Sequence, residues 1–172
     1  PEEVLLEAQK MREPTKDNAL GRVDYRKKMV FTIDGADSKD FDDAVSIGKT
    51  DEGNYLLGVH IADVTHYVKK GSKLDEEALK RGNSTYLPNK VIPMLPKELS
   101  NGLCSLNPGV DRLTITCVME INSEGEIVSH DVQKSIVNSK FRLVYNDISD
   151  ILENKDPLLI QKYSEIYDDL LL

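Results

Sequence analysis

The chain has 172 residues and a mass of 19.3 kDa, with 40% hydrophobic and 30% charged residues, so it is long enough to bury a core and too apolar to be disordered. Its 22 Lys and Arg against 30 Asp and Glu give a net charge of −8, which argues against nucleic-acid binding through a pervasive basic surface but not against acidic residues that hold metal ions. No apolar run approaches the ~20 residues of a membrane-spanning helix and no signal peptide is visible, so we expect a cytoplasmic protein without a membrane partner.

The first third of the chain is predicted to form one short helix and three strands. Acidic residues in the first turn and apolar residues at 4, 5, 8 and 11 predict a helix that ends before Pro14, so residues 1–21 are interpreted as a helix and a linker. Residues 29–33 are typical of a buried strand and lead into an acidic loop, residues 34–43. Residues 44–47 and 55–62 are two further strands, joined by a hairpin turn at 51–54.

The rest of the chain is predicted to combine helices with a second hairpin. Ser72 and Gly82 have the spacing of helix caps, so we expect a helix from about residue 74 to 81. Four of the seven prolines lie in residues 86–108, which predicts an ordered, irregular connection. A hairpin of residues 113–121 and 127–137 follows, and then helices at 145–152 and 157–172. The predicted fold class is α+β, with a mixed or antiparallel sheet, hairpins and flanking helices.

The acidic loop is the most informative part of the sequence. Five aspartates occur within ten positions, and two carboxylates held 4 Å apart repel by about 4 kcal/mol at an effective dielectric of 20. The aspartates therefore either point apart as a solvated turn or surround a cation. Oxygen ligands suit Mg²⁺ or Mn²⁺, and two such ions can activate water and stabilise the leaving oxygen of a phosphodiester. A calcium-binding EF-hand loop is excluded because Ala36, Ser38 and Lys39 occupy positions that need acids and a glycine.

Several longer motifs follow one another in a fixed order between about residues 22 and 150. Together they resemble the RNB catalytic domain of the ribonuclease II and ribonuclease R family, and the stretch from Asn107 to Arg112 is more similar to the bacterial ribonuclease R branch. The resemblance is specific because both the motifs and their spacing match. The motifs are Thr32–Asp34, Asp40–Ala44, Gly58–Val64, Arg81–Pro88, Ile92–Pro96 and Leu99–Leu106.

The resemblance implies an activity and a set of catalytic residues. The family consists of processive 3′→5′ exoribonucleases that need Mg²⁺, hydrolyse single-stranded RNA and release nucleoside 5′-monophosphates in RNA degradation and processing; Mn²⁺ is expected as a substitute metal. By position, Asp34, Asp40 and Asp43 match metal-binding catalytic aspartates, and Asp42 matches the carboxylate most critical to hydrolysis. Asp37 lies outside the motif and is expected to be a solvated loop residue.

Two tyrosines match family positions that contact RNA. Tyr86 matches an active-site tyrosine that packs on the 3′-terminal nucleotides, as an aromatic face that accepts any base can do. The alternative for Tyr86 is a core tyrosine. Tyr145 matches, less securely, a second tyrosine along the RNA channel, with simple packing as its alternative.

The resemblance also implies that this sequence is a piece of a longer protein. Residues 22–172 match the N-terminal half of the catalytic domain, whose later part supplies arginines and a further acid, and which OB-fold domains flank. We therefore expect single-stranded RNA and the OB-fold domains of the same polypeptide as partners. The intact protein is expected to be a monomer, and the isolated piece to be impaired or inactive.

The remaining polar residues are expected to be structural or solvated. The three histidines have no metal-ligand spacing, the scattered cations are interpreted as solvated, and two tyrosines at i, i+4 are interpreted as a packing pair. The two cysteines are expected to be reduced core residues, with a disulfide as the alternative. These residues are His60, His66 and His130; Lys90, Lys97, Arg112, Lys140 and Arg142; Tyr163 and Tyr167; and Cys104 and Cys117.

Two other functions remain open from the sequence. A degenerate RNB-like module would bind RNA or protein without cleavage, and loss of any of the four aspartates would favour it; none is lost. A phosphatase with an aspartyl nucleophile is the second alternative, but residues 40–43 lack the threonine that completes a D-x-D-x-T loop.

Overall fold

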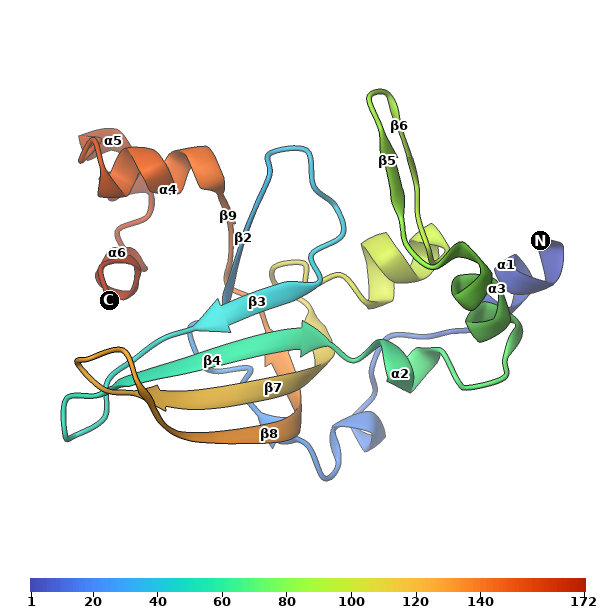
Figure 1. The fold of residues 1–172 in the computed structure, drawn as a ribbon, viewed down its shortest axis with the longest axis horizontal. Coiled ribbons are helices and arrows are strands. Elements are labelled where there is room, and N and C mark those ends of the chain that lie inside the picture. The colour runs from blue at the N-terminus through green and yellow to red at the C-terminus, as the bar shows by residue number, and fades with distance from the viewer.

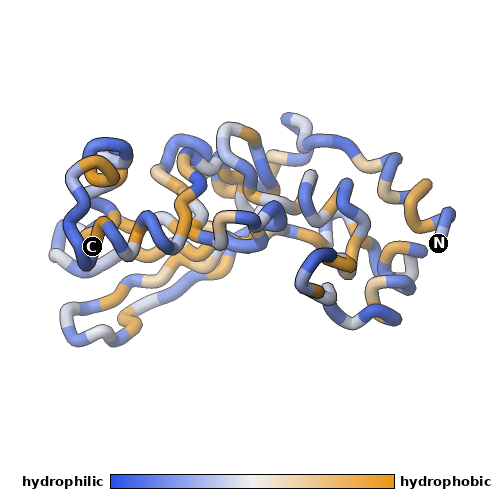
Figure 2. The backbone as a smooth tube through the Cα atoms, turned by 90° about the horizontal axis from the view of Figure 1, so that it is seen from above, coloured by the Kyte–Doolittle hydropathy of each residue, from blue (hydrophilic) through white to orange (hydrophobic).

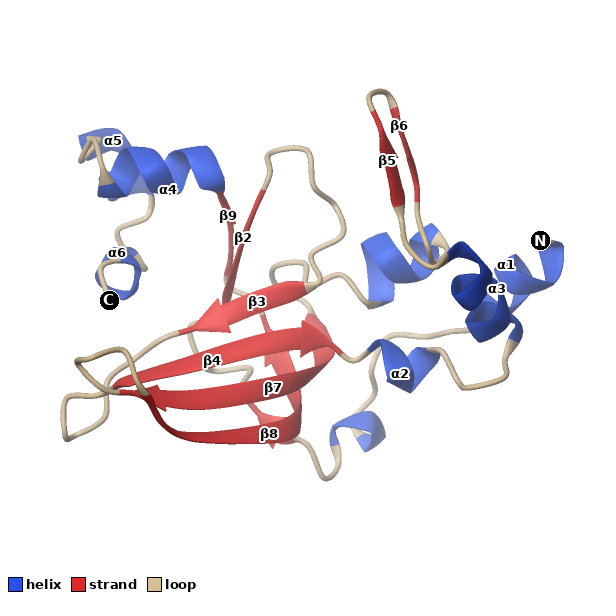
Figure 3. Cartoon of the chain, viewed as in Figure 1, coloured by secondary structure: helices blue, strands red, loops and turns tan.

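The computed structural model describes all 172 residues, and its centre is a seven-stranded mixed sheet (Figure 1 and Figure 3). The strand order is β1-β8-β7-β4-β3-β2-β9, with antiparallel pairs in the middle and parallel pairs at both edges, β1 with β8 and β2 with β9. This confirms the predicted α+β class. The strands are β1 Val23–Asp24, β2 Phe31–Asp34, β3 Asp43–Ser46, β4 Tyr55–Ala62, β7 Asp111–Ile121, β8 Ile127–Asn138 and β9 Phe141–Val144.

Both predicted hairpins of the sheet are confirmed. Strands β3 and β4 pair antiparallel, with Ala44 opposite His60, and β7 pairs with β8 along almost its whole length. Gly53 and Gly125 lie in the two turns with φ of 89° and 82°, a backbone conformation that glycine adopts without steric cost.

Helices gather at the two ends of the sheet (Figure 1). Near the N-terminus, α1 (Glu2–Ala8) packs against α3 (Lys73–Arg81), and α2 (Val64–Tyr67) follows β4. The predicted caps of α3 are confirmed: the Ser72 hydroxyl accepts a hydrogen bond from the Asp75 amide at 3.2 Å, and Gly82 ends the helix with φ of 75°. At the other end lie α4 (Tyr145–Leu152), α5 (Pro157–Lys162) and α6 (Tyr167–Leu170).

The proline-rich segment is more regular than predicted. It contains a separate two-stranded ribbon, β5 (Thr85–Leu87) and β6 (Lys90–Ile92), and a π-helix, η2 (Glu98–Leu103). The ribbon is compatible with its proline because Pro88 lies in the turn, outside the paired residues. Four further short elements were not predicted: β1, β9, α2 and a 3₁₀ turn at Asp17–Ala19.

The prediction of one continuous helix over residues 157–172 is wrong. Helix α5 ends at Lys162, the chain turns, and α6 begins at Tyr167. The turn between the two helices buries both Tyr163 and Ile166. Tyr163 and Tyr167 therefore pack against a shared core rather than as neighbours on one helix.

The core consists of two clusters that meet at β2. Val30, directly before β2, belongs to the larger cluster with Phe41 and Leu106, whereas Phe31, the first residue of β2, belongs to the smaller one beneath α4 to α6. Successive side chains of a strand point to opposite faces, so β2 is held from both sides. Figure 2 shows hydrophobic and hydrophilic residues alternating along the backbone, as expected of elements buried on one face.

The remaining structural expectations concern cysteines and membranes. Cys104 is buried, Cys117 is half-buried, and both are free, which confirms that they form no disulfide. No helix of the chain combines the length and the apolar character needed to cross a membrane.

Candidate active site

The acidic loop connects two neighbouring strands that separate as they enter it. Asp34 is the last residue of β2 and Asp43 the first of β3, and the two strands share a single paired position, Phe31 with Val45. Asp40 and Asp42 lie between the strands in the loop itself. In Figure 1 the loop rises above the sheet between α4 and the β5–β6 ribbon. Two of the four aspartates are thus held at strand ends, close to a buried sheet.

The second half of the loop is fixed by buried contacts. Phe41 is buried in the larger core cluster, whereas its sequence neighbours Asp40 and Asp42 are more exposed. Its amide donates to the Ser105 hydroxyl at 3.0 Å, that hydroxyl donates to the Lys39 carbonyl at 2.9 Å, and the Leu106 amide donates to the Phe41 carbonyl at 2.9 Å. A loop tied to the core in this way is not a freely solvated turn.

Asp34 carries an unsatisfied carboxylate oxygen. Its Oδ2 is buried and has no hydrogen-bond partner. Burial raises the pKa of Asp34 above its ordinary value, the nearby Thr32 hydroxyl and the charge of Arg142 lower it, and the negative charges of Asp43 and Asp40 add to the rise. A buried acceptor without a donor is rare in proteins, and a bound cation is one way to satisfy it.

Asp42 is accessible to solvent but recessed in a cavity. Burial raises the pKa of Asp42, followed by the charges of Asp40, Asp43 and Asp34. The four aspartates that the family motif singles out therefore affect one another electrostatically. Asp37 is exposed, which confirms its expected solvation.

The cavity has a volume of about 390 Å³ and lies between the acidic loop and the β5–β6 ribbon. Asp40 and Asp42 contribute its polar wall, and Tyr86 contributes an aromatic face. The remaining lining comes from the end of β4, the chain around the ribbon and η2, namely Ile61, Ala62, Val64, Ser84, Met94, Leu95, Ser100 and Cys104. Carboxylates beside an apolar and aromatic surface can accommodate a ligand with both a cationic or metal-bound part and a flat ring.

The donor chemistry of the loop fits a hard divalent cation, although the carboxylates are not gathered into a finished site. No three Asp, Glu, His or Cys side chains converge closely enough to form a ready-made metal centre. Three features favour a cation: the all-oxygen donor set, the mutual repulsion of the aspartates and the unpartnered Oδ2 of Asp34. The assignment of Asp34, Asp40 and Asp43 as metal ligands stays a prediction.

The two predicted RNA-binding tyrosines occupy different surroundings. Tyr86 is 64% exposed, lines the cavity and donates a hydrogen bond of 2.8 Å to Asp40 Oδ2, so it is not a core residue. Tyr145 is 60% exposed and follows Val144, which pairs with Asp34 in the sheet. It therefore starts α4 beside the acidic loop but does not line the cavity.

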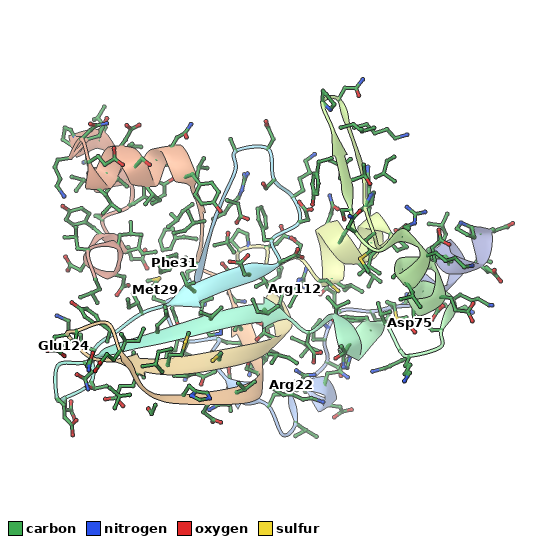
Figure 4. All side chains as sticks on the ribbon, in the orientation of Figure 1. Arg22, Met29, Phe31, Asp75, Arg112 and Glu124 are labelled. Carbon is green, nitrogen blue, oxygen red and sulfur yellow. The ribbon has the colours of Figure 1, made fainter.

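Two of the five cations expected to be solvated are structural instead. Arg112 is only 4% exposed, lies at the end of the sheet next to the acidic loop (Figure 4), pairs with Glu13 and donates from Nε to the Ser105 carbonyl at 2.9 Å. Arg142 donates to backbone carbonyls of the acidic loop. Nothing in the sequence distinguishes them from the exposed lysines, because only the fold brings Glu13 and the loop carbonyls to these two arginines. Lys90, Lys97 and Lys140 are exposed, as expected.

His60 has the structural role that was predicted for it. It is buried in β4, with Nε2 3.0 Å from the Ser46 hydroxyl and Nδ1 2.7 Å from the Thr116 hydroxyl. His130 is exposed on β8, and His66 packs edge-on against Tyr67. No histidine joins the aspartates.

The geometry agrees with the outcome of comparison with known proteins. The family model described as RNB domain matches residues 22–170. The chain belongs to the RNB domain family. It is 53% identical over 169 residues to Ribonuclease R of Thermotoga maritima, which covers 98% of this chain and 24% of that protein. It is 47% identical over 171 residues to Ribonuclease R 1 of Lactococcus lactis, which covers 99% of this chain and 21% of that protein.

Several solved structures share the fold. Mycoplasma genitalium RNase R in complex with ribose-methylated single-stranded RNA matches with a TM-score of 0.86 and 34% identity, over 99% of this chain and 28% of that one. Yeast Ssd1, described as a pseudonuclease, matches with a TM-score of 0.74 and 25% identity, over 84% of this chain and 18% of that one. The chain thus spans about a quarter of the length of its Ribonuclease R relatives.

Proposed function

We propose that the protein is a metal-dependent 3′→5′ exoribonuclease that hydrolyses single-stranded RNA to nucleoside 5′-monophosphates in RNA degradation and processing. Residues 22–172 would form the part of its RNB catalytic domain that carries the aspartates. The observation that supports this most strongly is geometric: Asp34 and Asp43 end adjacent strands, and Asp40 and Asp42 lie between them on a loop tied to the core. The fold shared with an RNase R bound to single-stranded RNA adds support for the substrate class.

The reaction requires water to attack a phosphodiester that already carries negative charge. The P–O3′ bond breaks, the 3′ oxygen takes a proton and remains on the shortened RNA, and the released nucleotide keeps the phosphate at its 5′ position. Mg²⁺ bound by Asp34, Asp40 and Asp43 would supply charge neutralisation and acidify water. Without such charge compensation, the acidic loop would repel RNA.

The residues that line the cavity have complementary roles in this proposal. Asp42 faces the cavity and would orient the attacking water through its carboxylate. Tyr86 offers its ring to the terminal bases, and stacking of this kind accepts every base. Tyr145 would contact the RNA farther along its path, next to the strand that ends in Asp34.

The wider context of the protein is part of the same proposal. We infer flanking OB-fold domains in the same polypeptide, a monomeric state and a cytoplasmic location from the family resemblance. The 172-residue chain alone would be impaired or inactive, because the family's catalytic domain continues beyond the matched region.

The test is a time course of RNA degradation by the protein at its natural length. Single-stranded RNA labelled at its 5′ end is incubated with Mg²⁺, with Mn²⁺ or with EDTA, and the products are separated by size. We expect stepwise shortening from the 3′ end only with metal. Asp42→Asn should lower turnover by at least about 100-fold, as loss of a general base does, while RNA affinity in EDTA stays within about threefold. Asp37→Asn is the matched control, because Asp37 belongs to the same loop but is exposed.

A non-catalytic RNB-like module is the second candidate. Two observations favour it: the fold is shared with a protein described as a pseudonuclease, and no ready-made metal centre is formed. RNA that is bound but left intact with either metal would decide for this candidate. Phosphate release from a small ester, without RNA shortening, would instead support the phosphatase alternative.

A further inference from the structure

Unsatisfied polar atoms are concentrated at the base of the acidic loop. The chain has four buried side-chain polar atoms without a hydrogen-bond partner, and three of them are Thr32 Oγ1, Asp34 Oδ2 and Arg142 Nε. Thr32 pairs with Arg142 in the parallel β2–β9 register, and Asp34 lies two residues beyond Thr32. Their side chains therefore leave the same face of the sheet. Because buried polar atoms are normally satisfied, such a concentration calls for a partner outside the protein chain, such as an ion or a water molecule.

Arg142 stabilises the first half of the acidic loop, residues 35–38, which the core residues do not fix. One terminal nitrogen of its guanidinium lies 3.3 Å from the carbonyl oxygens of both Gly35 and Ser38 and also bonds to that of Ala36. The only backbone hydrogen bond within residues 35–38 joins the Ser38 amide to the Gly35 carbonyl at 3.1 Å. The hydrogen bonds that Ser105 and Leu106 make to the acidic loop reach only Lys39 and Phe41. Without Arg142, the first half of the loop would have little to fix its path.

The guanidinium also spans the two halves of the loop. Its central carbon lies 5.2 Å from the centre of the Phe41 ring, within the range of a cation–π contact. Phe41 is the residue that anchors the second half to the core. Arg142 therefore contacts the loop on both sides of Lys39.

Arg142 contacts the backbone and leaves the carboxylates free. An arginine beside clustered aspartates would ordinarily form ion pairs with them, but Arg142 has no carboxylate oxygen within 4.0 Å of its nitrogens. Its charge still opposes the repulsion around Asp34, although burial is the largest influence on the pKa of that residue. It thus stabilises the loop without occupying the oxygens that a cation would need.

We propose that Arg142 is a positioning residue of the active site, which fixes residues 35–38 so that Asp34 and Asp40 can bind divalent metal together. The inference rests on the proposed function, because it assigns Arg142 a role in the same metal site. Arg142 is not a catalytic residue, since its contacts are with the loop. Residues that orient metal ligands typically change metal affinity or activity by about 10- to 100-fold when replaced.

The test measures metal binding separately from RNA cleavage, with the protein at its natural length. Binding of Mn²⁺ is followed by the loss of the free-ion electron paramagnetic resonance signal, RNA affinity is measured in EDTA, and the melting temperature is recorded. We expect Arg142→Gln to weaken Mn²⁺ binding and to lower kcat by about 10- to 100-fold, with KM for RNA, RNA affinity and melting temperature nearly unchanged. Lys140→Gln is the control, because Lys140 lies two residues away on the chain and is exposed.

A second variant keeps the test decisive if Arg142→Gln fails to fold. Arg142→Lys retains the charge and several donors but not the planar group above Phe41, so its Mn²⁺ affinity and kcat should lie between those of the wild type and Arg142→Gln. If the folded variants bind Mn²⁺ within about twofold of the wild type, Arg142 has no positioning role while the proposed function stands. If the wild type binds Mn²⁺ but does not cut RNA, the proposed function is wrong. Weaker Mn²⁺ binding by the Arg142 variants would in that case still support the positioning role of Arg142. If the wild type neither binds Mn²⁺ nor cuts RNA, both are wrong.

Discussion

The Tyr86 hydroxyl donates a hydrogen bond of 2.8 Å to Asp40 Oδ2, which joins the β5–β6 ribbon to the acidic loop across the cavity. This bond raises the pKa of Tyr86, and burial and the charge of Asp40 add to the rise. The ribbon has no strand partner in the main sheet. The contact gives Tyr86 two separable features, a hydroxyl that holds the ribbon against the loop and a ring that remains free to stack.

Substitutions of Tyr86 should separate these two features. Tyr86→Phe removes the hydroxyl and should leave RNA affinity within about threefold, because the ring remains, whereas Tyr86→Ala should weaken binding by about 1–3 kcal/mol, the usual contribution of one stacked base. Fluorescence anisotropy with labelled RNA in EDTA measures the affinities. Hydrogen exchange of residues 85–92 should become faster in both variants. Equal loss of affinity in Tyr86→Phe and Tyr86→Ala would mean that the hydroxyl, not the ring, determines binding.

Buried His60 should make the stability of the domain sensitive to mild acid. Burial lowers the pKa of His60 to about 4 from an ordinary value of 6.5, and the charge of Lys28 contributes. The unfolded chain therefore binds a proton at higher pH than the folded chain does. Stability is complete above pH 6.5 and falls as the pH drops from 6.5 towards about 4, by about 3 kcal/mol in total.

Urea unfolding across this pH range checks the contribution of His60. His60→Gln removes the titrating group and should flatten the decline, although its stability at neutral pH should be lower because two hydroxyl partners must be rearranged. His130→Gln is the control, since His130 is exposed and should change nothing. A decline of the same size in His60→Gln would assign the acid sensitivity to other groups.

Much of the fold was predictable because its signals are local. The caps at Ser72 and Gly82 and the turn glycines act within a few residues, and each predicted a boundary that the structure confirms. The β5–β6 ribbon and the broken C-terminal helix were missed because packing decides them. Tyr163, for example, leaves the helical path to reach the core, where its hydroxyl donates to Asp147 at 2.7 Å.

The aspartates of the candidate site were predictable from the sequence, but the residues that hold the acidic loop in place were not. The aspartates are adjacent in sequence, so their pattern is visible there. Arg142 and Ser105 act on the loop from more than sixty positions away and mostly through backbone atoms, which have no sequence signature. The same holds for the Tyr86–Asp40 bond, because only the fold brings the ribbon to the loop.

The buried ion pair of Arg22 and Asp63 should contribute far more to the stability of the fold than the exposed pairs do. The two side chains are 7% and 1% exposed, and their charged atoms lie 2.6 Å apart. Asp63→Asn should destabilise the protein by about 3–5 kcal/mol, because it leaves a buried charge without its counter-ion. Arg22 lies beside the β8 edge of the sheet, far from the acidic loop at the other edge (Figure 4), so metal binding should be unaffected. The comparison is Asp24→Asn, which breaks an exposed pair with Arg26 and should have little effect on the unfolding midpoint.

The same pair should contribute to acid unfolding, below the range set by His60. Burial alone would raise the pKa of Asp63, but hydrogen bonds from Thr65 and Arg22 and the charge of Arg22 outweigh it, so the pKa lies below its ordinary value of 3.8. The stabilisation is therefore present above about pH 4 and is lost as the pH falls through the lower, folded-state value. The difference in stability between wild type and Asp63→Asn should shrink as the pH drops below 4. A constant difference would show that Asp63 contributes through packing instead.

Gly58 should be intolerant of any side chain because two polar residues meet beside it. A Cβ at this position would lie 2.5 Å from the Ser46 hydroxyl and 3.1 Å from His60 Nε2, which themselves form a hydrogen bond of 3.0 Å. Gly58→Ala must displace Ser46 or His60, and overpacking of this kind costs about 1–3 kcal/mol. Gly48→Ala is the matched control, since no atom lies within 4 Å of its Cβ and its φ is not in the left-handed region. The free energy of unfolding should therefore be lower for Gly58→Ala than for Gly48→Ala. Equal values would mean that the hydroxyl of Ser46 moves away without cost.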